Sequence, residues 1–314
     1  MTVRALFLGT PDFAVPSLEA LCRLGYEVAV ITQPDRPRGR ARKLAPPAVK
    51  ARALELGLPV WQPERLRDAW EDARRFAPDL IVTAAYGNIL TERWLRLPQV
   101  GAVNVHASLL PRWRGAAPIQ RAILAGDEET GITLMEMVRE LDAGPILAQA
   151  PVAIKPDDTA GSLHDKLAAL GGEVCERYLP RYVAGELAAM PQPEEGVTYA
   201  DKLTRADEWI DWTSGADVID RQVRALAPVP GATAVLTTGE ELKVLAGRAA
   251  DAEPFGDPGE VKPCGDALLV SCGEGVYEIA EVKPSGRRAM PAGAFWRGLR
   301  EDGVRMRRKA TDDR

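Results

Sequence analysis

The chain has 314 residues, about twice the common domain length of roughly 150 residues, so its length predicts two domains. A composition of 46% hydrophobic and 27% charged residues is typical of a folded globular protein rather than a disordered one. The sequence has no apolar run long enough to span a bilayer and no signal-peptide pattern at its start. Four cysteines without a C-x-x-C pair, and two histidines, form no zinc-ligand pattern. We therefore expect a reduced, cytoplasmic protein without a metal or a membrane partner.

The net charge of -5 argues at first sight against a nucleic-acid partner, but it is unevenly distributed. Residues 34–52 hold seven basic residues and one acidic residue, and residues 283–314 hold ten basic and four acidic residues, so each segment carries +6. Subtracting these 12 charges from -5 leaves -17 on the remainder. Two basic segments on an acidic body favour local contacts with a polyanion; the alternative is a solvated loop and a frayed tail.

The first half of the chain alternates strand-like and helix-like segments. Continuously apolar stretches at residues 3–8, 27–32, 80–85 and 102–105 predict strands buried on both faces, as in a parallel sheet. Helical spacing is found over residues 13–24, 49–56 and 63–76, and again over 163–182. This succession predicts an α/β domain with a doubly wound, mostly parallel sheet and right-handed crossovers.

The pattern changes at residues 185–196, where Pro191, Pro193 and a glutamate pair are typical of a linker. Beyond it, residues 216–226 predict one amphipathic helix. Short segments at 233–237, 242–246, 259–262, 267–271 and 276–282 predict closely spaced strands, as in a small β-barrel. We therefore divide the chain into an α/β domain at 1–187, a linker at 188–203 and a β-domain at 204–314.

Common nucleotide-binding and nucleophile motifs are absent from the sequence. Gly9-Thr10-Pro11-Asp12 follows the first strand in place of G-x-G-x-x-G, and neither G-x-x-x-x-G-K-[ST] nor G-x-S-x-G occurs. Dinucleotide, P-loop and serine-hydrolase chemistry are therefore not predicted.

Polar residues instead gather at the end of the 102–105 strand. Asn104 and His106 stand two positions apart, so they share a face of the strand near its carboxyl end, where open α/β sheets bind ligands. Asp142, in a turn between strand-like segments, is the candidate carboxylate partner. The inert alternatives are a core histidine bonded to a carbonyl and an Asx-turn aspartate.

An amide, an imidazole and a carboxylate together suit acyl transfer to an amine without a metal. The amide of Asn104 can stabilise an oxyanion, and the imidazole of His106 can relay a proton near neutral pH. The carboxylate of Asp142 can orient the imidazole or take a proton from the attacking amine.

These residues resemble the folate-dependent formyltransferases. The resemblance covers nearly the whole chain and is carried chiefly by Asn104-Val-His106-Ala-Ser108-Leu-Leu-Pro111-Arg-Trp-Arg114-Gly-Ala-Ala-Pro118-Ile-Gln120 with Asp142. The Asn-x-His and Asp set is shared by these enzymes and indicates the reaction rather than the acceptor. The basic loop, the Trp-Arg-Gly-Ala-Ala-Pro-Ile-Gln run and the second domain resemble the members that act on tRNA.

The resemblance implies a Rossmann-like catalytic domain and an OB-like β-barrel that binds tRNA. It implies transfer of a formyl group from 10-formyltetrahydrofolate to the α-amine of methionine on initiator methionyl-tRNA. Asn104 and His106 would polarise the formyl oxygen, and Asp142 would assist proton removal from the amine. We expect a monomer, without a metal.

The resemblance also implies two sets of binding residues. The folate-contacting residues would be Ser108, Leu109, Leu110, Pro111, Tyr86 and Gly87. The tRNA-contacting residues, in a basic insertion at 34–50, would be Arg36, Arg38, Arg40, Arg42 and Lys43.

Two departures and two alternatives stay open. Ala107 and Glu140 stand where glycine occurs in other members of the family, which affects the shape of the pocket. A folate formyltransferase acting on a small amine would share the Asn-His-Asp set but would not need the second domain. A noncatalytic RNA-binding protein is disfavoured by the intact set.

Overall fold

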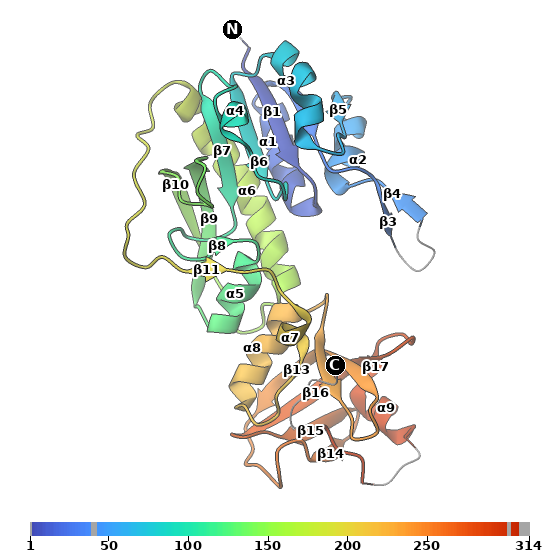
Figure 1. The fold of residues 1–314 in the computed structure, drawn as a ribbon. Helices are drawn as coiled ribbons and strands as arrows, with labels where there is room; N and C mark the ends of the chain where they lie inside the picture. Colours follow the sequence, from blue (N-terminus) through green and yellow to red (C-terminus); the bar gives the residue numbers. More distant parts are fainter. Residues whose placement is uncertain (1, 39–42, 300–302, 308–314) are drawn as a thin grey trace. The chain divides into compact units, whose positions relative to one another are not determined.

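The computed structural model describes residues 2–38, 43–299 and 303–307, which form two compact units (Figure 1). The first unit comprises Met1–Pro118, Glu129–Ala153 and His164–Ala200. The second comprises Ile119–Glu128, Ile154–Leu163 and Asp201–Arg314. Both units are therefore discontinuous in sequence, and the boundaries 1–187, 188–203 and 204–314 stay a prediction.

Within the described residues, the first unit is built on a seven-stranded sheet in the order β10-β9-β7-β6-β1-β2-β5. Neighbours from β7 to β5 pair in parallel, whereas β9 pairs antiparallel with both β7 and β10. The predicted mostly parallel α/β sheet is confirmed. The strands are β1 (Arg4–Gly9), β2 (Glu27–Ile31), β5 (Val60–Trp61), β6 (Leu80–Ala84), β7 (Gly101–His106), β9 (Glu129–Glu136) and β10 (Ile146–Ala153).

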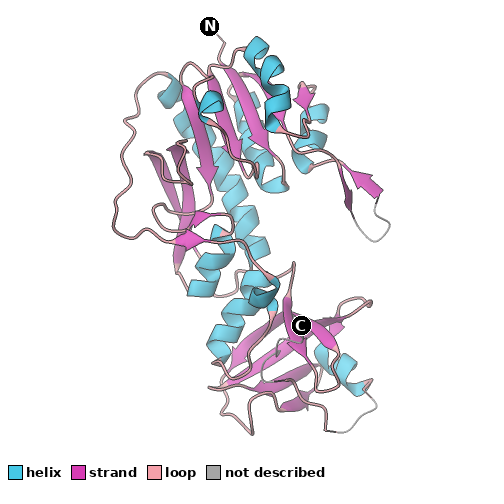
Figure 2. Cartoon of the chain, viewed as in Figure 1, coloured by secondary structure: helices cyan, strands magenta, loops and turns pink. Residues whose placement is uncertain are grey.

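Helices cover both faces of this sheet (Figures 1 and 2). On one face, α3 (Trp70–Phe76) and α4 (Glu92–Leu95) share a buried core with alternate strand residues such as Leu6 and Ile81. On the other, α1 (Val15–Arg23) packs against α6 (Ala160–Val183). A Cβ at Gly172 of α6 would lie 2.9 Å from the Pro16 carbonyl oxygen, so glycine permits this close packing.

Several short elements were not predicted. β3 (Arg36–Arg38) and β4 (Lys43–Ala45) pair as an antiparallel ribbon, which precedes the helix predicted over residues 49–56, α2 (Ala48–Glu55). β8 (Arg114–Gly115) pairs in parallel with β11 (Tyr199–Ala200). Strands of two or three residues are too short to show the alternation by which a strand is recognised in a sequence.

The second unit is mostly β-structure, as predicted. Its antiparallel sheet has the order β12-β13-β16-β15-β14, with β17 beside β16. Residues 305–307 lie between the two outer edges, because the Arg307 N–H donates to the Val235 carbonyl and the Met306 N–H donates to the Gly259 carbonyl. This arrangement agrees with the predicted small barrel, whose core contains Trp212 and Tyr277.

The other α-helices and β-strands in the described part of the chain are α5 (Pro118–Ala125), α7 (Arg205–Glu208), α8 (Ala216–Leu226), β12 (Ala232–Val235), β13 (Glu241–Ala250), β14 (Val261–Cys264), β15 (Ala267–Ser271), β16 (Val276–Pro284), β17 (Met290–Pro291) and α9 (Ala292–Arg297).

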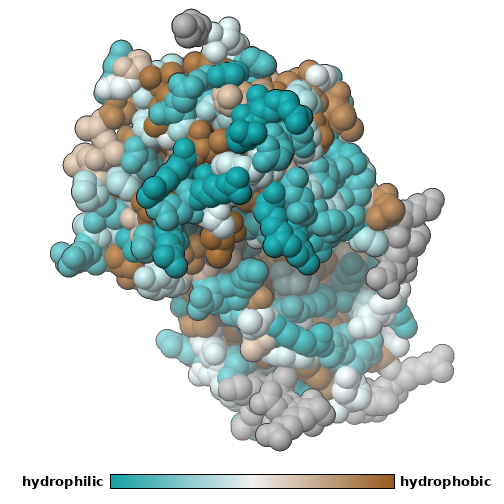
Figure 3. Space-filling model, turned by 45° about the horizontal axis from the view of Figure 1, so that its top comes forward, coloured by the Kyte–Doolittle hydropathy of each residue, from teal (hydrophilic) through white to brown (hydrophobic). Residues whose placement is uncertain are grey.

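Figure 3 shows a face of the molecule on which hydrophilic side chains predominate, with apolar ones between them. Of the helices in the described part of the chain, none combines the length and the apolar character needed to cross a membrane.

Candidate active site

The structure brings Asn104, His106 and Asp142 together. Asn104 and His106 lie at the carboxyl end of β7, and Asp142 lies in the turn between β9 and β10. Asn104 Nδ2 is 3.4 Å from Asp142 Oδ1, and His106 Nδ1 is 3.7 Å from Asp142 Oδ2. The His106 and Asp142 side chains are 6% and 14% exposed, so water screens their interaction little.

The orientation of the Asn104 amide is set by Thr83 on β6. The Thr83 hydroxyl is 2.8 Å from Asn104 Oδ1 and can donate to it, which directs the NH₂ group of Asn104 toward Asp142. Thr83 is almost fully buried, so the contact is sheltered from water. Asn104 is thereby held with its donor group on the side of the cluster.

A backbone carbonyl fixes the ring of His106. His106 Nε2 lies 2.9 Å from the carbonyl oxygen of Trp113, and a carbonyl only accepts, so Nε2 carries a hydrogen. Nδ1 is consequently the nitrogen that faces Asp142. The Trp113 backbone has φ 65°, and its N–H donates to Thr198 Oγ1 at 2.9 Å.

The carboxylate of Asp142 is held by a main-chain donor. Asp142 Oδ2 accepts from the Gly115 N–H at 2.9 Å, and the Asp142 backbone has φ 47°. Two residues on, a Cβ at Gly144 would lie 1.8 Å from the Glu136 carbonyl oxygen, so only glycine fits there without a backbone shift. The turn is therefore tightly specified on both sides of the carboxylate.

Thr83, Trp113 and Gln192 also belong to this site, and their roles were not predicted from the sequence. Gln192 donates from Nε2 to the carbonyl oxygens of Asp142 and Gly144, both at 2.8 Å. Thr83 lies opposite Asn104 in the parallel β6–β7 register, and the predicted strands do not by themselves give that register. Nothing in the sequence connects Gln192 with residues about fifty positions earlier.

The predicted folate-contacting stretch follows β7 directly. The Ser108 side chain is fully buried, and its hydroxyl donates to the Arg112 carbonyl at 2.6 Å, so it stabilises its own turn. The Leu110 carbonyl accepts from Gln149 at 2.8 Å; Leu109 and Pro111 flank it. Contact of Ser108, Leu109, Leu110 and Pro111 with folate stays a prediction.

Tyr86 and Gly87 lie just beyond the carboxyl end of β6, and β6 is a neighbour of β7 in the sheet. Tyr86 is 5% exposed, and burial raises the pKa of its hydroxyl, with a smaller opposing effect from the Asn88 side chain. Its carbonyl is 3.3 Å from Thr10 Oγ1, which links the ends of β6 and β1. Gly87 has φ 83°, a conformation that favours glycine.

Three of the predicted tRNA-contacting residues, Arg36, Arg38 and Lys43, lie on the β3–β4 ribbon. Arg36 is exposed, and Arg38 pairs with Lys43 in the backbone register. Arg40 and Arg42 lie outside the described residues.

A cluster at the base of this ribbon holds Asp35. Lys50 Nζ lies 2.7 Å from Asp35 Oδ2, and Gln62 Nε2 lies 2.8 Å from Asp35 Oδ1. The Gln62 amide and the Lys50 ammonium hold the pKa of Asp35 below its ordinary value. Lys50, counted in the basic segment, is therefore engaged with a carboxylate.

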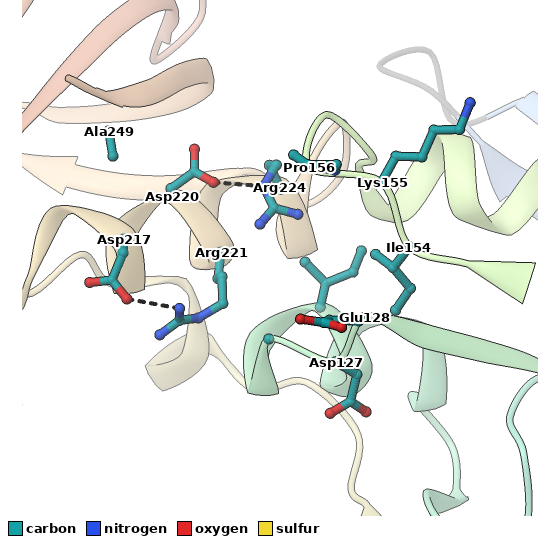
Figure 4. Close-up of a pocket in the computed structure, with 12 residues that line it drawn as sticks. Asp127, Glu128, Ile154, Lys155, Pro156, Asp217, Asp220, Arg221, Arg224 and Ala249 are labelled. Carbon is teal, nitrogen blue, oxygen red and sulfur yellow. Dashed lines mark hydrogen bonds and ion pairs between the residues drawn. The ribbon is translucent and has the colours of Figure 1, made fainter. Parts of the chain in front are cut away.

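A cavity of about 290 Å³ lies in the second unit (Figure 4). Charged side chains line it, but Arg221 and Arg224 of α8 pair with Asp217 and Asp220, at 2.8 Å and 2.7 Å. Because both arginines already have carboxylate partners within their own helix, we assign the cavity no ligand. In the described ranges, no group of three His, Cys, Asp or Glu side chains has the arrangement of a metal site.

Comparison with protein families gives two matches. Residues 3–179 match the formyl transferase family, and residues 202–300 match the formyl transferase C-terminal domain. The chain belongs to the formyl transferase family. Asn104, His106 and Asp142 of this formyl transferase all lie within the first match.

Individual relatives match over nearly their whole length. A methionyl-tRNA formyltransferase of Halorhodospira halophila is 53% identical over 304 residues, which are 96% of this chain and 97% of the relative. A methionyl-tRNA formyltransferase of Methylococcus capsulatus is 49% identical over 296 residues, 93% of this chain and 96% of the relative.

Solved structures with this fold include HypX and a sugar formyl transferase. HypX from Aquifex aeolicus in complex with tetrahydrofolic acid has a TM-score of 0.66 and 20% identity, over 95% of this formyl transferase but 47% of that chain. WlaRD, a sugar 3N-formyl transferase in the presence of dTDP and 5-N-formyl-THF, has a TM-score of 0.68 and 16% identity, over 92% of this chain and 100% of that one. At these identities the likeness shows the fold.

Proposed function

We propose that this formyl transferase moves the formyl group of 10-formyltetrahydrofolate to the α-amine of methionine on initiator methionyl-tRNA. The product is N-formylmethionyl-tRNA for translation initiation. The observation that carries the proposal is the Asn104-His106-Asp142 cluster, in a chain 53% identical over nearly its whole length to a relative named methionyl-tRNA formyltransferase.

The reaction sets clear demands on the site. The amine nitrogen forms a bond to the formyl carbon, and the bond from that carbon to N10 of the folate breaks. One proton leaves the amine, and one is delivered to N10. In between, the formyl oxygen carries negative charge, which the protein stabilises with hydrogen-bond donors.

Asn104 and His106 supply these donors. The Asn104 NH₂ group is held in place through the contact of its carbonyl with Thr83, 2.8 Å away. Loss of one such donor reduces kcat by about 10²–10³-fold in a well-studied enzyme. When protonated, His106 offers Nδ1–H to the same oxygen, because Nε2 is engaged by the Trp113 carbonyl at 2.9 Å.

Asp142 is the group that takes the proton from the amine. Its Oδ1 faces Asn104 and its Oδ2 faces His106, so an amine attacking a formyl group held by these two donors meets the carboxylate. The Gly115 N–H, 2.9 Å from Oδ2, fixes the direction of the carboxylate before the substrates arrive. Such prior orientation is a principal source of catalytic rate.

The folate is a substrate of this reaction and enters beside the cluster. Ile89 and Leu141 are large apolar side chains, 82% and 61% exposed, two residues after Gly87 and one before Asp142. Exposed apolar side chains so close in sequence to predicted site residues fit a flat heteroaromatic ring. We propose that Tyr86, Gly87 and residues 108–111 supply the remaining contacts.

We propose that the acceptor is held by the basic ribbon, through Arg36, Arg38, Arg40, Arg42 and Lys43, and by the barrel at residues 204–314. Basic residues that contact phosphates supply affinity without base specificity. The enzyme would act as a monomer in the cytoplasm, where translation starts.

The test is a formylation assay without added metal. Purified protein is given 10-formyltetrahydrofolate with one of three acceptors: initiator methionyl-tRNA, elongator methionyl-tRNA, or an amino-sugar nucleotide as the small amine. We expect product on the initiator tRNA, less on the elongator tRNA and none on the small amine. Formylation of the small amine alone would assign the enzyme to the other acceptor class, and no formyl transfer at all would refute the proposal.

A further inference from the structure

Gln192 fixes the backbone beside Asp142. Its Nε2 donates to the Asp142 and Gly144 carbonyl oxygens, both at 2.8 Å. Its Oε1 accepts from Arg114, at 3.0 Å from Nε and 2.7 Å from Nη2. A glutamine has two N–H donors and an oxygen with two lone pairs, so these contacts use its whole hydrogen-bonding capacity. Gln192 thus connects β8 to the turn that carries Asp142.

The turn depends on such contacts. Asp142 has φ 47°, in the left-handed region that residues other than glycine disfavour. Val138 and Leu141, on the approach to it, are 36% and 61% exposed, so burial of these apolar side chains contributes little to holding the turn. Directed hydrogen bonds from Gln192 are therefore well placed to keep the carboxylate in position.

The chain around Gln192 is itself anchored on both sides. The Met190 N–H donates to the Ile146 carbonyl at 2.9 Å, and the Ile146 N–H donates back at 2.7 Å. Downstream, Thr198 Oγ1 accepts from the Trp113 N–H at 2.9 Å. The segment predicted as a linker is thus bonded to both loops of the site.

We propose that Gln192 is a positioning residue for formyl transfer, holding the Asp142 backbone so that its carboxylate meets Asn104 and His106. The proposal rests on the proposed function. Because a reacting group displaced by about 1 Å can lose about 10²-fold in rate, loss of these contacts is expected to lower kcat by about 10- to 100-fold.

Two substitutions separate this role from simple anchoring of Arg114. Gln192→Leu removes every hydrogen bond of the side chain. Gln192→Glu keeps an acceptor for Arg114, now charged, but loses both donors and directs oxygen atoms at the two carbonyls. We expect both variants to lower kcat, with the KM for methionyl-tRNA changing by less than about threefold. Wild-type kcat in Gln192→Glu would assign the contribution to Arg114 and overturn the proposal.

A double-mutant cycle tests whether Gln192 acts through Asp142. In an Asp142→Asn background, Gln192→Leu is expected to change kcat by less than about twofold, since the carboxylate to be positioned is gone. A full additive loss overturns the proposal. Gln222→Leu serves as the matched control for the exchange experiment that follows, because Gln222 likewise donates to two backbone carbonyls, those of Asp207 and Trp209 at 2.8 Å and 2.9 Å.

Hydrogen exchange gives a readout that needs no activity. In both Gln192 variants, backbone amides of residues 139–146 are expected to exchange faster than in the wild type, but not in Gln222→Leu. Unchanged exchange overturns the proposal. If the wild type formylates no acceptor, the proposed function fails, whereas this comparison still decides whether Gln192 holds the turn. Circular dichroism identifies any variant that does not fold. If Gln192→Leu does not fold, the kcat and exchange measurements on Gln192→Glu decide the proposal.

Discussion

Replacing Asp142 with asparagine removes the charge of the cluster while keeping the shape of the side chain. Asp142 Oδ2 lies 3.7 Å from His106 Nδ1, and both side chains are largely buried. At an effective dielectric constant of about 20, unit charges at this separation attract by about 4 kcal/mol. If the transition state carries a protonated His106, loss of that attraction alone corresponds to a decrease of about 10³-fold in kcat.

The assay is kcat for formylation of initiator methionyl-tRNA at saturating 10-formyltetrahydrofolate, with the thermal midpoint of each variant measured alongside. The matched control is Asp79→Asn, because the Asp79 side chain is 23% exposed, pairs with Arg4 and accepts from the Arg4 N–H at 2.8 Å, outside the cluster. The control is expected to keep kcat within about twofold of the wild type. If Asp142→Asn keeps kcat within about tenfold of the wild type, the electrostatic argument is refuted.

Three further results are expected. Gly144→Ala places a Cβ 1.8 Å from a carbonyl oxygen, so urea unfolding should show a loss of about 1–3 kcal/mol, and unchanged stability would contradict the tight turn. Arg36→Ala should lower the slope of log Kd for tRNA against log salt by about 1, whereas Arg67→Ala, at a side chain 72% exposed, should not. Hydrogen bonds from Gln62 and Lys50 lower the pKa of Asp35 in the folded protein. The ionised carboxylate therefore stabilises the fold above its unfolded pKa of about 3.9, and this stabilisation is lost as the pH falls through the lower folded value. The difference in unfolding free energy between wild type and Asp35→Asn should therefore shrink below about pH 4, and a constant difference would contradict this.

The main elements of the fold were predictable because burial imposes a pattern on long segments. The apolar stretch at 80–85 became β6, and the helical spacing at 163–182 became α6, Ala160–Val183. The β3–β4 ribbon and the β8–β11 pair were not predictable, since each strand has two or three residues and its partner is decided by tertiary contacts. Sequence periodicity reports burial, and these short strands bury little.

The same limit applies within the site. Asn104 and His106 were predicted to share a face because the period of a strand is two, and both side chains do reach Asp142. That Asn104 is oriented by Thr83 depends on strand register, and the contact of Gln192 with the Asp142 turn depends on the path of a loop. Local pattern identifies the candidate catalytic groups, whereas the groups that orient them come from distant parts of the chain.

The basic loop shows how pairing changes a charge counted from sequence. Lys50 Nζ lies 2.7 Å from Asp35, and Arg52 Nε lies 2.7 Å from Glu19, so two of the seven basic residues at 34–52 already have carboxylate partners. The basic residues of this segment that we propose contact phosphates are Arg36, Arg38, Arg40, Arg42 and Lys43, of which Arg40 and Arg42 lie outside the described residues. Each phosphate contact adds about -0.7 to -0.9 to the salt slope, so this loop accounts for at most about -3.5 to -4.5. A larger loss of slope on neutralising 34–52 would mean that Lys50 and Arg52 exchange their carboxylates for phosphates. The salt dependence of tRNA binding therefore reports whether the Asp35 cluster survives in the complex.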